Sequence, residues 1–145
     1  MQNVLTLCIG NICRSPLAEV LLARELPSHR VWSAGLSAMV GWQADATSIQ
    51  IAQEQGLDLS AHRAQQVTSI MCQQADLILV MEQSHKAQLE QQFPLVRGKV
   101  FRLGQYGNFD IADPYRQPRD AFDSAWSAIA RGVADWAPRI RQLSR

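Results

Sequence analysis

The sequence has few cysteines, no long apolar run and almost no net charge, and each of these shortages excludes a class of protein. Three cysteines in 145 residues are too few for a disulfide framework and favour a reducing compartment. No apolar stretch approaches the roughly 20 residues that a transmembrane helix needs, so we expect no membrane insertion. A formal net charge of +1 gives no bulk attraction to nucleic acid or to an anionic membrane. Any anion must therefore bind at a local site.

The N-terminus lacks the basic segment, long apolar core and cleavage site of a signal peptide, so the cytoplasm is the expected compartment. The three histidines, His29, His62 and His85, are scattered without metal-ligand spacing, and we predict neither a metal nor another cofactor. The length suits one domain, and no repeat or linker divides it. We therefore expect a single domain over residues 1–145, acting as a monomer.

Short apolar runs alternate with segments of helical periodicity along the chain. Strands are predicted at 4–7, 31–34, 77–81 and 99–103, and helices after residue 15, at about 45–55, 66–73 and 84–93, and over 122–140. Pro138 is expected to kink or fray the last helix. The alternation predicts an α/β fold with three layers, in which helices cover both faces of a four-stranded parallel sheet. Ligands of such folds bind beyond the carboxyl ends of the strands.

The segment after the first strand has the features of an anion-binding loop. Ser15 and Pro16 are typical of a helix start, with Ser15 as the N-cap and Pro16 at the first helical position. Backbone N–H groups ahead of a helix can converge on an anion, and the helix dipole adds positive potential. The planar guanidinium of Arg14 can hold two phosphate oxygens. The predicted phosphate-binding loop consists of Ile9, Gly10, Asn11, Ile12, Cys13, Arg14 and Ser15.

Cys8 begins this loop, where a helix N-terminus and a nearby cation favour the thiolate, the nucleophilic form of cysteine. Ser15 can donate a hydrogen bond to its sulfur. Gly10 permits close backbone approach, and Asn11 tolerates a left-handed conformation and can tie the loop together. A thiolate beneath a bound tetrahedral dianion can attack phosphorus, so Cys8 is the predicted nucleophile. The alternative is a buried, inert cysteine ahead of a helix.

Cleavage of a phosphate ester also requires a proton for the leaving oxygen. The long loop at 104–119 is a candidate functional segment, and it offers Asp110 and Asp113 as acids. Asp113 precedes Pro114, which holds its backbone extended. A simple turn aspartate is the alternative interpretation of Asp113.

The segment from Cys8 to Pro16 resembles the C-x-G-N-x-C-R-S-P signature of low-molecular-weight protein-tyrosine phosphatases. The likeness covers almost the whole chain and extends to residues 33–35, 62–64, 76–81 and 113–115. It is strongest to bacterial enzymes paired with tyrosine autokinases of capsule or exopolysaccharide export. The resemblance implies that Cys8, Arg14 and Asp113 are catalytic, through a phosphocysteine intermediate. It also implies a tyrosine-phosphorylated protein partner, namely such an autokinase.

The resemblance further implies that Ser33 is a buried hydroxyl supporting the loop, together with Asn11 and Ser15. Cys13 follows Cys8 by five positions, and in a loop curled around an anion the two sulfurs could approach each other. We predict a reversible Cys8–Cys13 disulfide that protects Cys8 from over-oxidation. A packing role for Cys13 is the alternative.

The expected substrate pocket is a slot for a phenyl ring, deep enough to favour phosphotyrosine over phosphoserine. Tyr115 is predicted to form one wall, and Leu36 with the 38–42 loop, Trp42 included, the other. A partly buried surface aromatic is the alternative for Trp42. Arg116 stands where the family often carries a second aromatic, which points to acidic substrate sequences.

Two other activities fit parts of the same pattern. Arsenate reductases on this scaffold relay oxidation through two further cysteines, whereas Cys72 alone lies outside the loop. A non-hydrolytic phosphocysteine carrier or phosphate-binding module would not need Arg14 and Asp113 together. The residues therefore favour a phosphatase.

Overall fold

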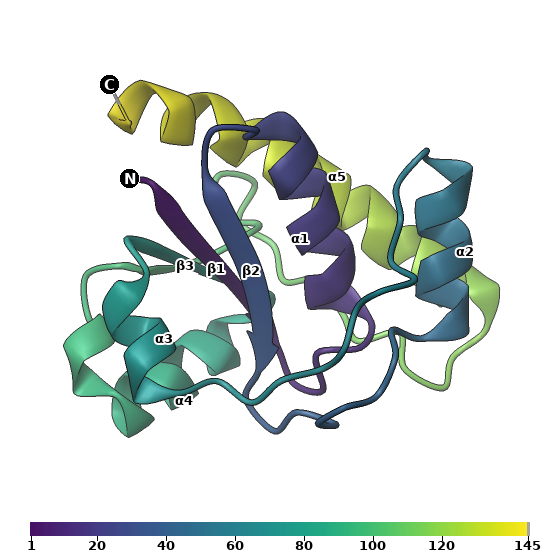
Figure 1. Ribbon diagram of the computed structural model, residues 1–145, viewed down its shortest axis with the longest axis horizontal. Helices are drawn as coiled ribbons and strands as arrows, with labels where there is room; N and C mark the ends of the chain where they lie inside the picture. The colour runs from purple at the N-terminus through teal and green to yellow at the C-terminus, as the bar shows by residue number, and fades with distance from the viewer. Residues whose placement is uncertain (145) are drawn as a thin grey trace.

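The computed structural model describes residues 1–144, which form a four-stranded parallel sheet between two layers of helices (Figure 1). The strands are β1 (Asn3–Cys8), β2 (Arg30–Gly35), β3 (Leu77–Val80) and β4 (Val100–Arg102), in the order β2-β1-β3-β4. Each neighbouring pair is parallel. The predicted fold class is therefore confirmed. No helix within residues 1–144 is both long and apolar enough to cross a membrane.

One face of the sheet carries α1 (Arg14–Glu25) and α5 (Arg119–Leu143), with α2 (Ala46–Glu54) packed against both. The other face carries α3 (Ser69–Gln74), α4 (Gln83–Gln92) and the short 3₁₀ helix η1 (Pro94–Val96) (Figure 1). Side chains of a strand alternate between faces, so β1 and β3 contribute to two separate apolar clusters. The first cluster takes Val4, Cys8, Leu77 and Leu79, and the second takes Leu5, Leu7, Ile78 and Val80.

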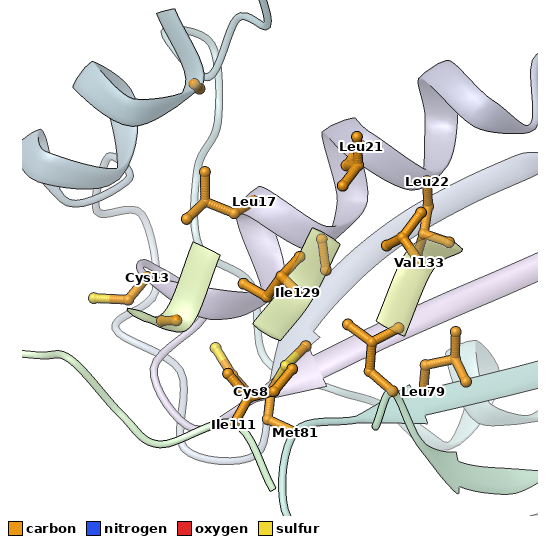
Figure 2. Packing of buried hydrophobic residues seen from close by; sticks show 14 of the residues in the cluster. Cys8, Cys13, Leu17, Leu21, Leu22, Leu79, Met81, Ile111, Ile129 and Val133 are labelled. Atoms are coloured by element: carbon orange, nitrogen blue, oxygen red, sulfur yellow. The ribbon is translucent and has the colours of Figure 1, made fainter. Parts of the chain in front are cut away.

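The larger core lies between α1, α5 and the sheet. Figure 2 shows Leu17 and Leu21 of α1, Ile129 and Val133 of α5 and Leu79 of β3, which belong to this core. All five side chains are buried. Full burial of one such side chain stabilises the fold by roughly 1.5–3 kcal/mol, so this core fixes α1 firmly on the sheet. The loop between β1 and α1 is thereby held at both ends.

The start of α1 and the end of α5 differ from the sequence-based expectation. Helix α1 begins at Arg14, and its N-cap is Cys13, which makes no side-chain cap. Ser15 therefore lies inside the first turn, and its hydroxyl bonds to side chains of the loop instead. Helix α5 runs through Pro138 to Leu143. Ile140 beyond the proline is fully buried, and this packing offsets part of the roughly 3 kcal/mol cost of an internal proline.

Helices α2 and α3 each begin directly after a residue whose side chain caps the helix. Asp45 caps α2, because its Oδ1 accepts a hydrogen bond from the backbone N–H of Thr47 at 2.9 Å. Helix α3 begins three residues later than expected, because Thr68 caps it and Gln66 forms an isolated parallel bridge with Gly35. That bridge extends the edge of β2 beside the candidate site.

Candidate active site

The carbonyl groups of the loop after β1 all point away from its centre. Each carbonyl from Cys8 to Cys13 accepts a hydrogen bond from the chain around it. The donors are the backbone N–H groups of Leu36, Ser37, Met39 and Asp45, the ring of His62 and the hydroxyl of Ser48. Because the peptide unit is planar and trans, an outward carbonyl turns the following N–H inward. The N–H groups of residues 9–14 therefore form a cradle for an anion at the N-terminus of α1.

A chain of side-chain hydrogen bonds leads to the Cys8 sulfur. Asn11 is left-handed, with φ of 59°, and its Nδ2 donates to Ser15 Oγ at 2.8 Å and to Ser33 Oγ at 2.9 Å. Ser33 donates in turn to Glu19 Oε1 at 2.5 Å. Ser15 Oγ accepts from Asn11, so its own O–H is free to donate to Cys8 Sγ, 3.0 Å away. That bond stabilises a thiolate. The structure thus brings together the side chains expected to support the loop.

Arg14 is buried, with 2% of its side chain exposed, and two acceptors hold one corner of its guanidinium. Nη1 donates to Glu82 Oε2 at 2.6 Å and to the carbonyl of Ile111 at 2.7 Å. Nη2 lies 3.7 Å from Asp113 Oδ2. Because Nη1 is occupied, the edge formed by Nε and Nη2 is left to grip two oxygens of an anion.

The structure separates the two candidate acids. Asp110 accepts hydrogen bonds from Arg102 Nη1 at 3.1 Å and from the backbone N–H of Gln83 at 3.0 Å, which anchors the loop after β4. Asp113 lines the cavity over Cys8 and is half-exposed. Its Oδ1 accepts from the backbone N–H of Tyr115 at 3.1 Å. Only Asp113 of the two is therefore placed to reach a leaving group.

The cavity has a volume of about 140 Å³ and opens above the loop. Its walls are Cys8, Ile9, Gly10, Ile12, Cys13, Arg14, Ser37, Met39, Asp113 and Tyr115. Tyr115 thus lies where the sequence predicted. Leu36 and Trp42 do not, and this part of the pocket prediction is corrected. Leu36 is buried in the apolar cluster on the other face of the sheet, and Trp42 is 56% exposed outside the lining. Met39, from the predicted 38–42 loop, forms that wall together with Ser37.

Gly35 and Gly10 differ in the space that surrounds them for a side chain. Gly35 pairs with Cys8 in the sheet, and a Cβ there would lie 2.5 Å from the carbonyl oxygen of Ile9. A side chain at Gly35 would therefore push the loop out of shape. A Cβ on Gly10 would lie 3.5 Å from Met39, an ordinary contact. The close approach of the Gly10 backbone to a bound anion stays a prediction.

Sequence reasoning missed three contributors to the site: Glu19, His62 and Glu82. Glu19 sits one helical turn after Ser15, a spacing that places both on the same face of α1. Glu82 follows β3, and its place in the site depends on β3 lying next to β1 in the assembled sheet. His62 comes from an irregular segment, whose path no periodic pattern encodes.

A buried cysteine, an anion cradle, an arginine and a half-exposed carboxyl meet around one cavity, as in a cysteine-dependent phosphatase. The model of the low molecular weight phosphotyrosine protein phosphatase family matches residues 3–145. The probable low molecular weight protein-tyrosine-phosphatase EpsP of Ralstonia nicotianae is 48% identical over 143 residues, which are 99% of each chain. The low molecular weight protein-tyrosine-phosphatase Wzb of Escherichia coli K12 is 45% identical over 140 residues, 96% of this chain and 95% of Wzb.

The fold comparison agrees. The crystal structure of the tyrosine phosphatase Wzb from Escherichia coli K30 in complex with sulphate has a TM-score of 0.92 at 41% identity, covering 96% of this chain and 98% of that one. The chain belongs to the low molecular weight phosphotyrosine protein phosphatase family, and it is a protein-tyrosine phosphatase.

Proposed function

We propose that residues 1–145 act as one phosphatase domain, which hydrolyses phosphotyrosine through a phosphocysteine on Cys8. The observation that carries this proposal is the arrangement around a single cavity of the Cys8 sulfur, the inward N–H groups, Arg14 and Asp113. The cradle and the guanidinium hold the phosphate oxygens and stabilise the charge that develops on them in the transition state.

In the first step the Cys8 thiolate attacks phosphorus. The S–P bond forms as the bond to the phenolic oxygen breaks, and Asp113 gives its proton to that oxygen. In the second step the Asp113 carboxylate takes a proton from water, whose oxygen attacks phosphorus. The S–P bond breaks, inorganic phosphate leaves, and the thiolate bonded to Ser15 is restored.

The lining of the cavity supports an aryl phosphate as substrate. Met39 and Tyr115 provide apolar walls for a phenyl ring, and the ring lets a phosphate reach Cys8 at the cavity floor. Arg116 stacks on Tyr115, with its guanidinium carbon 5.2 Å from the ring centroid, and adds positive charge near the entrance for an acidic substrate segment. The sequence resemblance to enzymes of capsule or exopolysaccharide export supports a tyrosine autokinase as the partner. In this proposal the phosphatase is a monomer and acts in the cytoplasm.

The test is release of inorganic phosphate from p-nitrophenyl phosphate and from two peptides of one sequence carrying phosphotyrosine or phosphoserine. The buffer contains EDTA and a reductant. We expect metal-independent turnover and a preference of about 100-fold for the phosphotyrosine peptide, because the shorter serine ester leaves the ring slot empty. A fresh, folded and reduced protein that released no phosphate would instead support the carrier or binding-module alternative, and arsenate-dependent oxidation of a thiol reductant would support the arsenate reductase.

Peroxide is expected to inactivate the enzyme reversibly through a Cys8–Cys13 disulfide. Burial, with a smaller contribution from the charge of Asp45, raises the pKa of the Cys13 thiol, so Cys13 is a poor first target for peroxide. Peroxide oxidises the Cys8 thiolate to a sulfenic acid. The Cys13 sulfur, in the same cavity, then attacks the Cys8 sulfur, and water leaves as the S–S bond forms.

Mass mapping of the inactive enzyme should find the linked Cys8–Cys13 peptide, and dithiothreitol should restore activity. After peroxide treatment, Cys13→Ser should lose activity and should not regain it with dithiothreitol. Cys72→Ala is the matched control, because Cys72 is buried in the cluster on the opposite face of the sheet and should recover like the wild type. Recoverable inactive enzyme without the linked peptide would contradict the prediction.

A further inference from the structure

Glu82 contacts the catalytic arginine although it belongs to another element. It is the N-cap residue of α4, yet its side chain makes no capping hydrogen bond. Its Oε2 instead accepts from Arg14 Nη1 at 2.6 Å. Asp110 accepts from the backbone N–H of Gln83, the first residue of α4, at 3.0 Å. The Glu82 carboxylate is therefore left for Arg14 instead of serving as the cap of its own helix.

The topology explains the encounter. Strand β3 lies beside β1 in the sheet, so the chain leaving β3 passes the loop that leaves β1. The backbone N–H of Ile111 donates to the carbonyl of Met81 at 2.9 Å, which brings the Ile111 carbonyl to the same Nη1 atom. Two acceptors from different segments thus converge on one corner of the guanidinium and fix its plane.

His85 closes the other side of Glu82. Its Nε2 lies 3.4 Å from Glu82 Oε2, the residue is 3% exposed, and its Nδ1 is buried without a hydrogen-bond partner among residues 1–144. Burial and then the charge of Arg14 lower the pKa of His85, while the carboxylates of Glu82, Asp110 and Asp113 raise it. The balance keeps the ring neutral at neutral pH, so His85 does not compete with Arg14 as a cation for Glu82.

We propose that Glu82 is a positioning residue of the phosphatase reaction: it clamps Nη1 of Arg14 so that Nε and Nη2 face the phosphate, while the buried His85 ring lies beside it without forming an ion pair. This inference rests on the proposed function of Arg14 as the phosphate-binding residue. It differs from a purely structural role, in which Glu82 merely neutralises a buried cation. A structural role predicts lower stability with unchanged kinetics of the folded enzyme.

The test compares Glu82→Gln and Glu82→Ala with Glu90→Gln, a matched control on α4 whose side chain is only partly buried. We expect kcat/KM for p-nitrophenyl phosphate to fall about 10-fold in the glutamine variant and about 100-fold in the alanine variant, because misplacing a catalytic group by about 1 Å costs that much. Most of the loss should fall on kcat, since Arg14 grips hardest in the transition state. Glu82→Asp, whose side chain is one methylene shorter, should not restore the rate.

Binding of sulfate gives a readout that does not depend on turnover. In a Cys8→Ser background, calorimetry should show sulfate binding weakened several-fold by Glu82→Gln and unchanged by Glu90→Gln. NMR titration should show the His85 pKa falling further in Glu82→Gln, since the Glu82 charge raises it. Wild-type kcat/KM and sulfate affinity in folded Glu82→Gln would overturn the inference, even if that variant melted earlier. Failure of the phosphatase proposal would appear separately, as an absence of turnover in the wild type.

Discussion

Replacing Cys8 by serine should lower the release of phosphate from p-nitrophenyl phosphate by about 10⁴-fold or more. A serine hydroxyl is not ionised at neutral pH, and neither Arg14 nor the helix N-terminus can shift that balance far enough. The substitution also removes the intermediate itself, because a phosphoserine ester in the loop lacks the good thiolate leaving group of phosphocysteine. The measurement is the initial rate with EDTA and reductant present.

Two controls make this result specific. The Cys8→Ser protein should still bind sulfate, because the cradle is formed by backbone N–H groups and Arg14 rather than by sulfur. Cys72→Ala should keep its kinetic constants, since Cys72 lies in the core on the opposite face, although the lost volume will reduce stability. A Cys8→Ser protein that turned over within tenfold of the wild type would eliminate Cys8 as the nucleophile.

The sequence allowed the sheet and the phosphate loop to be predicted for the same reason. Short apolar runs such as Leu77–Val80 are buried on both sides and can be recognised without knowing their neighbours. The loop is equally local: Cys8, Asn11, Arg14 and Ser15 lie within one strand–helix connection, so their order along the chain nearly determines their arrangement. Even here the predicted start of α1 was two residues too late, because the Ser15 hydroxyl bonds to Cys8 and Asn11 and does not cap the helix.

Residues that reach the site from distant segments were harder to predict. Met39 lines the cavity while Trp42, from the same irregular loop, faces solvent, and nothing in their spacing decides between them. The backbone of that loop is fixed by hydrogen bonds to the carbonyls of Ile9 and Gly10, a tertiary effect. Glu82 belongs to the same class. Its role depends on β3 lying next to β1, which only the assembled sheet reveals.

Asp113→Ala should lower kcat for a phosphotyrosine peptide by about 10²–10⁴-fold, the usual contribution of a general acid. The loss arises because the phenolate of tyrosine leaves poorly without a proton. For p-nitrophenyl phosphate the loss should be much smaller in the first step, because p-nitrophenolate leaves readily unprotonated. Burst kinetics with both substrates can then separate phosphorylation of Cys8 from hydrolysis of phosphocysteine, for which Asp113 acts as the base.

Asp110→Ala is the control that distinguishes the acid from its neighbour. Asp110 tethers Arg102 and the N-terminus of α4, so its removal should loosen the loop and lower stability. It should not make the rate depend more steeply on the leaving group, since Asp110 does not line the cavity. A steep dependence in Asp110→Ala, or an Asp113→Ala enzyme that hydrolysed phosphotyrosine at the wild-type rate, would transfer the acid's role away from Asp113. The paired result expected here assigns proton transfer to the half-exposed carboxylate beside Arg14, and loop anchoring to the one beside Arg102.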